Sequence, residues 1–190
     1  LLGIVDGRVP LIIEVKSTWS DDHTYERNIA AALSGYQGDV AVMSFDPDSV
    51  TAFRYLAPSL PHGLVAERFD DMQHWSELSA LQRFAMRHLL TAAIARPNFI
   101  AYDIRALPAL APGIARDVFH LPLLTWTVRT EAEKANAERF AQEARLQEQQ
   151  AREERNKALR AQVVQLAAAA EGQIDAGDRP ARTDAFAGRV

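Results

Sequence analysis

Cysteine is absent from this chain of 190 residues, and so is any long apolar run. Without cysteine the chain forms no disulfides and offers no thiolate ligands, so a metal ion would be held by oxygen or histidine ligands. No stretch of about 18 apolar residues is present to span a bilayer as a helix. Residues 1–5 also lack the charged leader and the length of a signal peptide. These absences predict a soluble chain, which we expect in the cytoplasm.

A surplus of positive charge is missing as well. The chain holds 21 Lys and Arg against 25 Asp and Glu, which gives a formal net charge of −4. Nucleic-acid binders usually present a basic field, so we expect no nucleic-acid partner. The 48% hydrophobic and 24% charged residues are typical of an ordinary soluble domain with a real core. The chain also lacks an initiator methionine and starts abruptly on apolar residues, which predicts a fragment of a longer protein.

The most informative stretch is residues 10–17, an apolar, β-branched run that ends with an acid and a base. In a strand, alternate side chains share a face, so Ile12, Glu14 and Lys16 should line one surface. Ile13 and Val15 should line the other surface. Two interpretations of the charged pair stay open: an ion pair at a strand end beside solvent, or a carboxylate metal ligand steadied by a neighbouring ammonium.

Four further apolar runs recur along the chain and predict strands. The five predicted strands cover residues 11–16, 40–45, 64–68, 99–104 and 123–128. A helical segment follows each of them, and this alternation is typical of parallel βα units in an α/β fold. The strands start about 28 residues apart, close to the roughly 31 residues per unit of an eight-unit barrel.

Two predicted helices carry specific signals. Between Trp75 and Ile94, residues that include Leu78, Leu81 and Phe84 form an apolar stripe at helical spacing. Another helix should start after Thr130, because Glu133 stands three residues later and completes a capping box. Pro108, Pro112 and Gly113 restrict any helix between the last two strands to a short one.

The composition changes at residue 141, where Ala, Gln, Glu and Arg become dominant. We therefore divide the chain into residues 1–140, a long charged helix over 141–171, and a disordered tail over 172–190 that is rich in Gly, Asp, Pro and Arg. Apolar residues of the helix form one short stripe, made of Leu159, Val163, Leu166 and Ala170. This stripe is too short for a sustained coiled coil. It leaves a weak self-association seam and a solvated helix as interpretations, and the second fits better.

Three segments, in this order and spacing, resemble the glycerophosphodiester phosphodiesterase family. They are VPLIIEVKS at residues 9–17, VAVMSFDPDSV at 40–50 and LLTWTVRT at 123–130. The resemblance covers roughly residues 7–140 and implies a TIM barrel, of which the chain holds about the third to seventh units. Strands one, two and eight of the barrel would be missing. It also implies that Glu14 is one of the carboxylates that hold a divalent cation, Mg²⁺ or Ca²⁺, and that Lys16 is an active-site cation.

The family's reaction converts a glycerophosphodiester and water to glycerol phosphate and an alcohol, a step of lipid metabolism. TIM barrels place their chemistry where the strands end, so Phe45 and Trp126 are candidates for an apolar wall beside the glycerol or alcohol part of this small substrate. Core packing explains both aromatic residues almost as well. Two other acids at predicted strand ends, Glu67 and Asp103, fit strand-end caps equally well.

The resemblance also predicts that the chain is catalytically incomplete alone. Family members take two further acidic ligands and two catalytic histidines from their first two units, in His-Arg-Gly, Glu-Asn-Thr and His-Asp motifs that do not occur here. None of the five histidines, expected in loops or on helices, matches a catalytic position. The alternative is a non-catalytic binding or scaffolding piece whose long helix recruits partners. Its open sheet edges would favour weak self-association.

Overall fold

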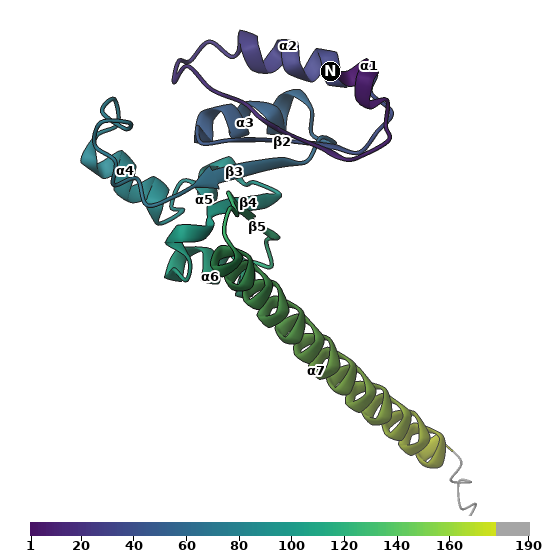
Figure 1. Cartoon of the computed structure of the whole chain (residues 1–190). Coiled ribbons are helices and arrows are strands. Elements are labelled where there is room, and N and C mark those ends of the chain that lie inside the picture. Colours follow the sequence, from purple (N-terminus) through teal and green to yellow (C-terminus); the bar gives the residue numbers. More distant parts are fainter. Residues whose placement is uncertain (178–190) are drawn as a thin grey trace, which may run out of the picture. The chain divides into compact units, whose positions relative to one another are not determined.

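The computed structural model describes the backbone of residues 1–177, and the side chains within this range except those of 142–148, 151, 164 and 166–177. The chain divides into two compact units, residues 1–144 and residues from 145 onward. Five strands alternate with helices in the first unit (Figure 1). The strands are β1 Leu11–Glu14, β2 Val40–Ser44, β3 His62–Ala66, β4 Phe99–Asp103 and β5 Leu123–Trp126. The helices are α1 Leu2–Val5, α2 Thr24–Leu33, α3 Pro47–Leu56, α4 Ala80–Arg87, α5 Ala92–Ala95, the 3₁₀ turn η1 Ile104–Ala106, α6 Leu110–Asp117 and α7 Glu131–Gly177.

The five strands form one sheet in chain order, β1-β2-β3-β4-β5, and every neighbouring pair is parallel. Parallel neighbours require a crossover connection, and the helices between the strands supply it. The predicted α/β arrangement of five adjacent parallel βα units in a curved sheet is therefore confirmed.

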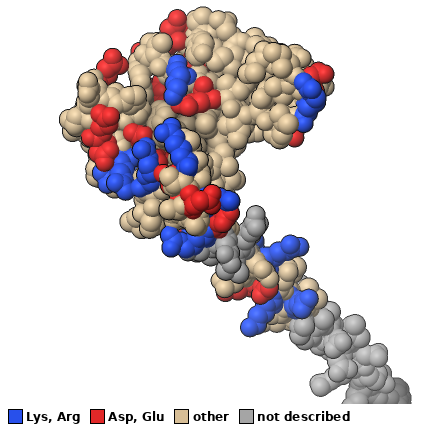
Figure 2. Space-filling view, viewed as in Figure 1, with Lys and Arg blue, Asp and Glu red and all other residues tan. Residues whose placement is uncertain are grey.

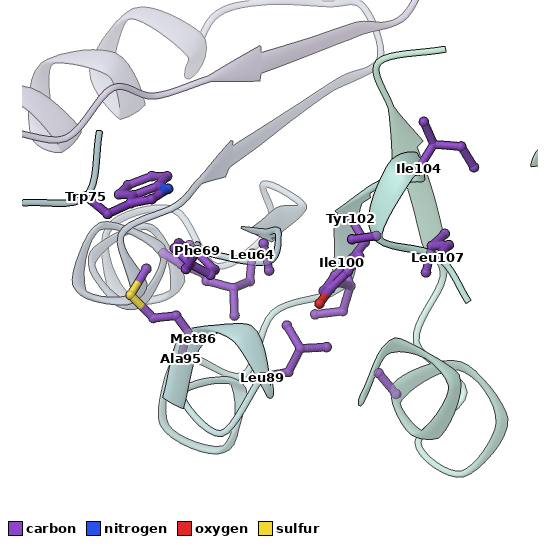
Figure 3. Close-up of a cluster of buried hydrophobic side chains, with 14 of the residues drawn as sticks. Leu64, Phe69, Trp75, Met86, Leu89, Ala95, Ile100, Tyr102, Ile104 and Leu107 are labelled. Carbon is purple, nitrogen blue, oxygen red and sulfur yellow. The ribbon is translucent and has the colours of Figure 1, made fainter. Parts of the chain in front are cut away.

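One face of the sheet packs against helices, because alternate apolar residues of the strands point that way. Leu64, Ile100 and Tyr102 join Met86 and Leu89 in the larger core (Figure 3). A second core forms over the first strands. It contains Val15, Leu33, Val42, Phe53 and Leu60, with Ile13 packed against it.

Strand β3 lies two residues earlier than predicted, from His62 to Ala66 rather than from residue 64 to 68. His62 and Gly63 have little intrinsic preference for strands, but the neighbouring strands impose the conformation. The His62 N–H donates to the Asn98 side chain at 3.0 Å. A side chain at Gly63 would collide with the ring of Phe99, whose nearest atom lies 2.2 Å from the site of a Cβ atom. Any larger residue at that position would force the Phe99 ring to move, which explains a glycine within a strand.

The strongly helical region predicted over residues 75–94 is helical only in part. The segment instead contains two shorter helices, α4 and α5, and Trp75 lies in a turn before them. A capping box between Ser79 and Gln82 starts α4 at Ala80. Leu89 interrupts the segment because its φ of 55° is left-handed. Two members of the expected stripe are exposed, Leu81 by 77% and Phe84 by 54%, so that stripe does not pack as predicted.

Helix α7 starts where the capping box predicts. The Thr130 hydroxyl accepts from Glu133 N–H, and the Glu133 carboxylate accepts from the N–H groups of Arg129 and Thr130 at 2.8 and 2.9 Å. These bonds hold the pKa of Glu133 below its usual value. In its first turns, Ala137 and Phe140 pack against the larger core.

The far end of α7 is Gly177 rather than the expected Glu171. One internal glycine costs a helix only about 1 kcal/mol relative to alanine, so Gly172 does not end it. The expected disorder of residues 178–190 lies outside the described residues. None of the helices that the structure describes, α7 included, combines the length and the apolar character needed to cross a membrane.

Candidate functional site

The four residues singled out from the sequence, Glu14, Lys16, Phe45 and Trp126, lie at or just after the carboxyl ends of β1, β2 and β5. Neighbouring strand residues settle their orientation. Ile13 and its partner Val42 face the helices, so Glu14, one position along, faces the other way. The structure therefore brings the predicted residues to one face of the sheet.

The charges of Glu14 and Lys16 form an ion pair, with the Lys16 Nζ atom 2.5 Å from the Glu14 Oε1 atom. The pair is accessible, because the Lys16 side chain is 76% exposed and that of Glu14 is 30% exposed. The same ammonium lies 5.7 Å from the centre of the Phe45 ring. A cation at this distance from an aromatic face is attracted by it. The charged pair and the aromatic ring thus form one continuous surface.

Phe45 is the centre of an aromatic cluster that we define as Trp19, Phe45, Phe69, Trp75 and Trp126. Its ring centre lies 5.2 Å from Trp75, 5.6 Å from Trp126 and 6.1 Å from Phe69. Phe69 and Trp75 are 4.9 Å apart, and Trp19 approaches Trp75 at 6.4 Å. Phe69 and Trp75 are buried members of the larger core (Figure 3), so the partly exposed rings of Phe45 and Trp126 supply the apolar wall beside the charged pair.

Sequence reasoning missed three members of this cluster: Trp19, Phe69 and Trp75. They lie in the segments that follow β1 and β3. The available signal was the presence of large aromatic residues shortly after predicted strands, where loops of a barrel carry function. Trp75 was instead assigned to a helix, which concealed its position near the strand ends.

The two other strand-end acids are already engaged. The Glu67 Oε1 atom accepts a hydrogen bond from the Trp75 indole N–H at 2.7 Å. Asp103 is buried and accepts from the guanidinium and the backbone N–H of Arg105, at 2.8 and 2.9 Å. The hydrogen bond to Asp103, with its negative charge, raises the pKa of Arg105. Asp103 therefore caps η1, whereas Glu67 anchors the aromatic cluster.

Trp126 carries an unusual polar atom. Its indole Nε1 is buried and has no hydrogen-bond partner in the part of the chain that the structure describes. A buried donor without an acceptor costs about 1–3 kcal/mol. An acceptor oxygen brought to this ring by a ligand would remove that cost.

The side chains that the structure describes do not by themselves complete a metal site. Among them, no group of three or more His, Asp or Glu side chains is arranged to hold one. Mg²⁺ prefers six oxygen ligands and Ca²⁺ six to eight, of which Glu14 supplies at most two. Glu14 is a single carboxylate, and its Oε1 atom is bound to Lys16.

One histidine differs from expectation. His62 is the first residue of β3 rather than a loop or helix residue, and it is 3% exposed. Its Nδ1 atom lies 3.0 Å from the Leu60 carbonyl oxygen. His62 is thus at the amino end of a strand, whereas the predicted site residues follow the carboxyl ends.

Charged side chains of both signs are interspersed over the surface drawn in Figure 2. The described residues on this face form no continuous basic field, so the charged groups act locally.

Comparison with known proteins supports the fold. No family model matches the sequence, and no curated protein does. A solved structure from Silicibacter pomeroyi DSS-3, named a "putative glycerophosphoryl diester phosphodiesterase", matches with a TM-score of 0.50 and 19% identity. The match covers 70% of this chain and 45% of that protein, so the chain spans less than half of its length. At this identity the likeness shows a shared partial-barrel fold.

Proposed function

We propose that this chain is the five-strand part of a barrel that hydrolyses a glycerophosphodiester to glycerol phosphate and an alcohol. The observation that carries the proposal is the Glu14–Lys16 pair beside the Phe45–Trp126 wall, on one face of the sheet at its carboxyl edge. TIM barrels use this edge for chemistry. A phosphodiester with a glycerol group needs both a cation and an apolar surface, and this edge offers the two together.

Each residue has a role that its surroundings support. The exposed ammonium of Lys16 neutralises phosphate charge while staying close to the Phe45 ring. Phe45 and Trp126 contact the carbon atoms of the glycerol or alcohol part. The Trp126 indole N–H, which lacks an acceptor among the described residues, donates to a substrate oxygen.

For Glu14 we propose the role of one ligand to a divalent cation, Mg²⁺ or Ca²⁺. The described side chains do not complete such a site, so the remaining ligands would come from further βα units of a closed barrel. His74 reaches the aromatic cluster, with its ring centre 4.5 Å from that of Trp75, but by resemblance it does not occupy a catalytic position of the family. Since proton transfer and charge stabilisation act as a unit, we expect the chain alone to be inactive.

The test is hydrolysis of glycerophosphocholine in the presence of Mg²⁺ or Ca²⁺. The chain alone is compared with a completed barrel, in which the first two units and the last strand are grafted from the Silicibacter pomeroyi protein. We expect turnover only in the completed barrel. Glu14→Ala should reduce that turnover by at least about 100-fold, which corresponds to loss of a group acting in the transition state.

Lys134→Met is the matched control, because Lys134 forms an exposed ion pair on α7, 3.9 Å from Glu131. It should leave turnover unchanged. Activity in the chain alone, or full activity in the Glu14→Ala barrel, would overturn the proposal.

A binding or scaffolding piece remains the second candidate. It is favoured by the missing metal-ligand group among the described side chains and by the 47-residue length of α7. A completed barrel that folds, binds no divalent cation and hydrolyses no diester would favour this candidate over the enzyme.

A further inference from the structure

A pocket opens on the helix-packed side of the sheet, between α4, α6 and the carboxyl ends of β3 and β4. Its volume is about 430 Å³. Arg68, Asp70, Arg87 and His88 line it, together with Tyr102 and the first turn of α6. Tyr102 is 2% exposed and belongs to the core between sheet and helices (Figure 3), so its ring faces away from the Glu14–Lys16 pair.

Two arginines that line this pocket form no ion pair among the described residues. Neither Arg68 nor Arg87 has a carboxylate within ion-pair distance in the part of the chain that the structure describes. Arg68 donates one hydrogen bond, at 2.7 Å, to the Arg105 carbonyl oxygen, which orients the group and leaves its other donors available. Both charges act on the Tyr102 hydroxyl, where they oppose the effect of burial that raises its pKa. Arg68 and Arg87 thus line the same pocket as the buried phenol.

Helix α6 adds backbone donors to the pocket. Its N-cap residue is Ala109, which has no side chain able to accept a hydrogen bond. Among the described residues, the N–H groups of Leu110 and Ala111 have no acceptor, and Pro112 has no N–H. Uncapped N–H groups and the helix dipole favour an anion at this end of a helix.

Two features of the pocket disfavour the binding of an anion. Asp70 lines the pocket with one negative charge, and α4 ends at Arg87 with its partial negative charge. Two full guanidinium charges exceed one carboxylate, and the His88 ring supplies a further N–H donor in either protonation state. The balance of charge in the pocket is positive.

We propose that this pocket binds a phosphate-type oxyanion. Guanidinium groups form paired hydrogen bonds with phosphate oxygens, and the α6 N–H groups supply additional donors. Inorganic phosphate and the phosphate of a monoester share this chemistry. The pocket is larger than a bare phosphate requires, so the monoester is the expected occupant. The site does not depend on the activity proposed above.

The test is titration of the full chain with glycerol 3-phosphate, with inorganic phosphate and with neutral glycerol, followed by calorimetry and by NMR of the backbone amides. Saturable binding is expected for both phosphates, tighter for the monoester, with no binding of glycerol. The amide resonances of Leu110 and Ala111 should shift. Arg87→Gln should weaken binding at least about tenfold, as expected for loss of hydrogen bonds to a charged group.

Arg96→Gln is the matched control, because Arg96 is exposed and does not line the pocket. It should bind as the unchanged chain does. Circular dichroism of each variant establishes whether it is folded. If Arg87→Gln does not fold, Arg68→Gln provides a second pocket variant. Equal affinity in the pocket variants and the control, amide shifts elsewhere only, or no saturable binding would overturn the proposal. If inorganic phosphate binds more tightly than glycerol 3-phosphate, the occupant of the pocket is the free anion rather than a monoester.

Discussion

The two faces of the sheet differ in exposure at its edge strands, β1 and β5. On the helix-packed face, Val42 and Ile100 are fully buried, whereas on the opposite face Ile12 is 53% exposed and Leu124 is 37% exposed. Between these edges, every residue of β3 and β4 is buried. Strands of a closed parallel barrel are normally buried on both faces. The difference indicates that the helix-packed face stabilises the sheet at its edges. The other face carries Glu14 and Lys16, with the partly exposed rings of Phe45 and Trp126 beside them.

Matched isoleucine substitutions give the largest test of this difference. Ile100→Ala removes a fully buried side chain and should lower the free energy of unfolding by about 2–5 kcal/mol. Ile12→Ala, on the exposed face, should lower it by less than about 1 kcal/mol. Urea denaturation of both variants measures the two values. Equal losses would mean that the exposed face also stabilises the fold, which would break the comparison.

Two tryptophan substitutions within the aromatic cluster should produce the next largest effect. Trp75→Phe removes the N–H that donates to the half-buried Glu67 carboxylate, and leaving that acceptor unsatisfied should cost about 1–3 kcal/mol beyond the lost ring volume. Trp126→Phe makes the same change of ring but removes a donor that has no described partner. It should therefore be clearly less destabilising in the same urea experiment. A larger loss for Trp126→Phe would show that its indole N–H is satisfied in solution.

Tyr102 allows a smaller, pH-dependent test on the helix-packed face. Its hydroxyl donates to the Arg87 carbonyl oxygen at 3.2 Å, so Tyr102→Phe should cost about 0.5–1.5 kcal/mol at neutral pH. Burial raises the pKa of Tyr102 above its ordinary value of 10.0. Because the unfolded chain releases this proton first, the stabilisation is fully present below pH 10.0 and is lost as the pH rises through the folded value.

The stability difference between the unchanged chain and Tyr102→Phe should accordingly shrink above pH 10.0. Tyr25→Phe is the control, because Tyr25 is 52% exposed and should show no such trend. Denaturation at a series of alkaline pH values, with tyrosinate absorbance as a second measurement, tests this directly. A difference that stays constant with pH would contradict a buried hydroxyl.

The contrast between the faces also explains what sequence reasoning could and could not predict. Alternation with a period of two placed Glu14 and Lys16 together, because a strand's geometry dictates that spacing locally. The apolar runs likewise predicted the order of five parallel units. By contrast, β3 begins at His62 because its neighbours supply hydrogen bonds, and Leu89 adopts a left-handed conformation that its residue type does not favour. Such positions depend on tertiary contacts.

The site was predictable in part for the same reason. Phe45 and Trp126 belong to motifs at strand ends, and the structure places them 5.6 Å apart. Trp19, Phe69 and Trp75 reach the cluster through loops whose paths no periodic pattern encodes. The role of Glu14 as a metal ligand stays a prediction, since it depends on partners that the described side chains do not include.

The smallest expected change in stability belongs to the residue that matters most for the proposed chemistry. Lys16→Met removes an ion pair whose lysine is 76% exposed, and exposed pairs contribute only about 0–1 kcal/mol. Methionine keeps a long apolar side chain beside Phe45, and Glu14 stays hydrated through its 30% exposed carboxylate. We therefore expect a change in the free energy of unfolding below about 1 kcal/mol, similar to that of Lys134→Met on α7.

In a completed barrel the same Lys16→Met substitution should strongly reduce hydrolysis of glycerophosphocholine, whereas Lys134→Met should not. If Lys16→Met instead destabilises the chain as much as Ile100→Ala, the ammonium is a structural element. The open face would then differ from the helix-packed face in exposure, but both faces would stabilise the fold.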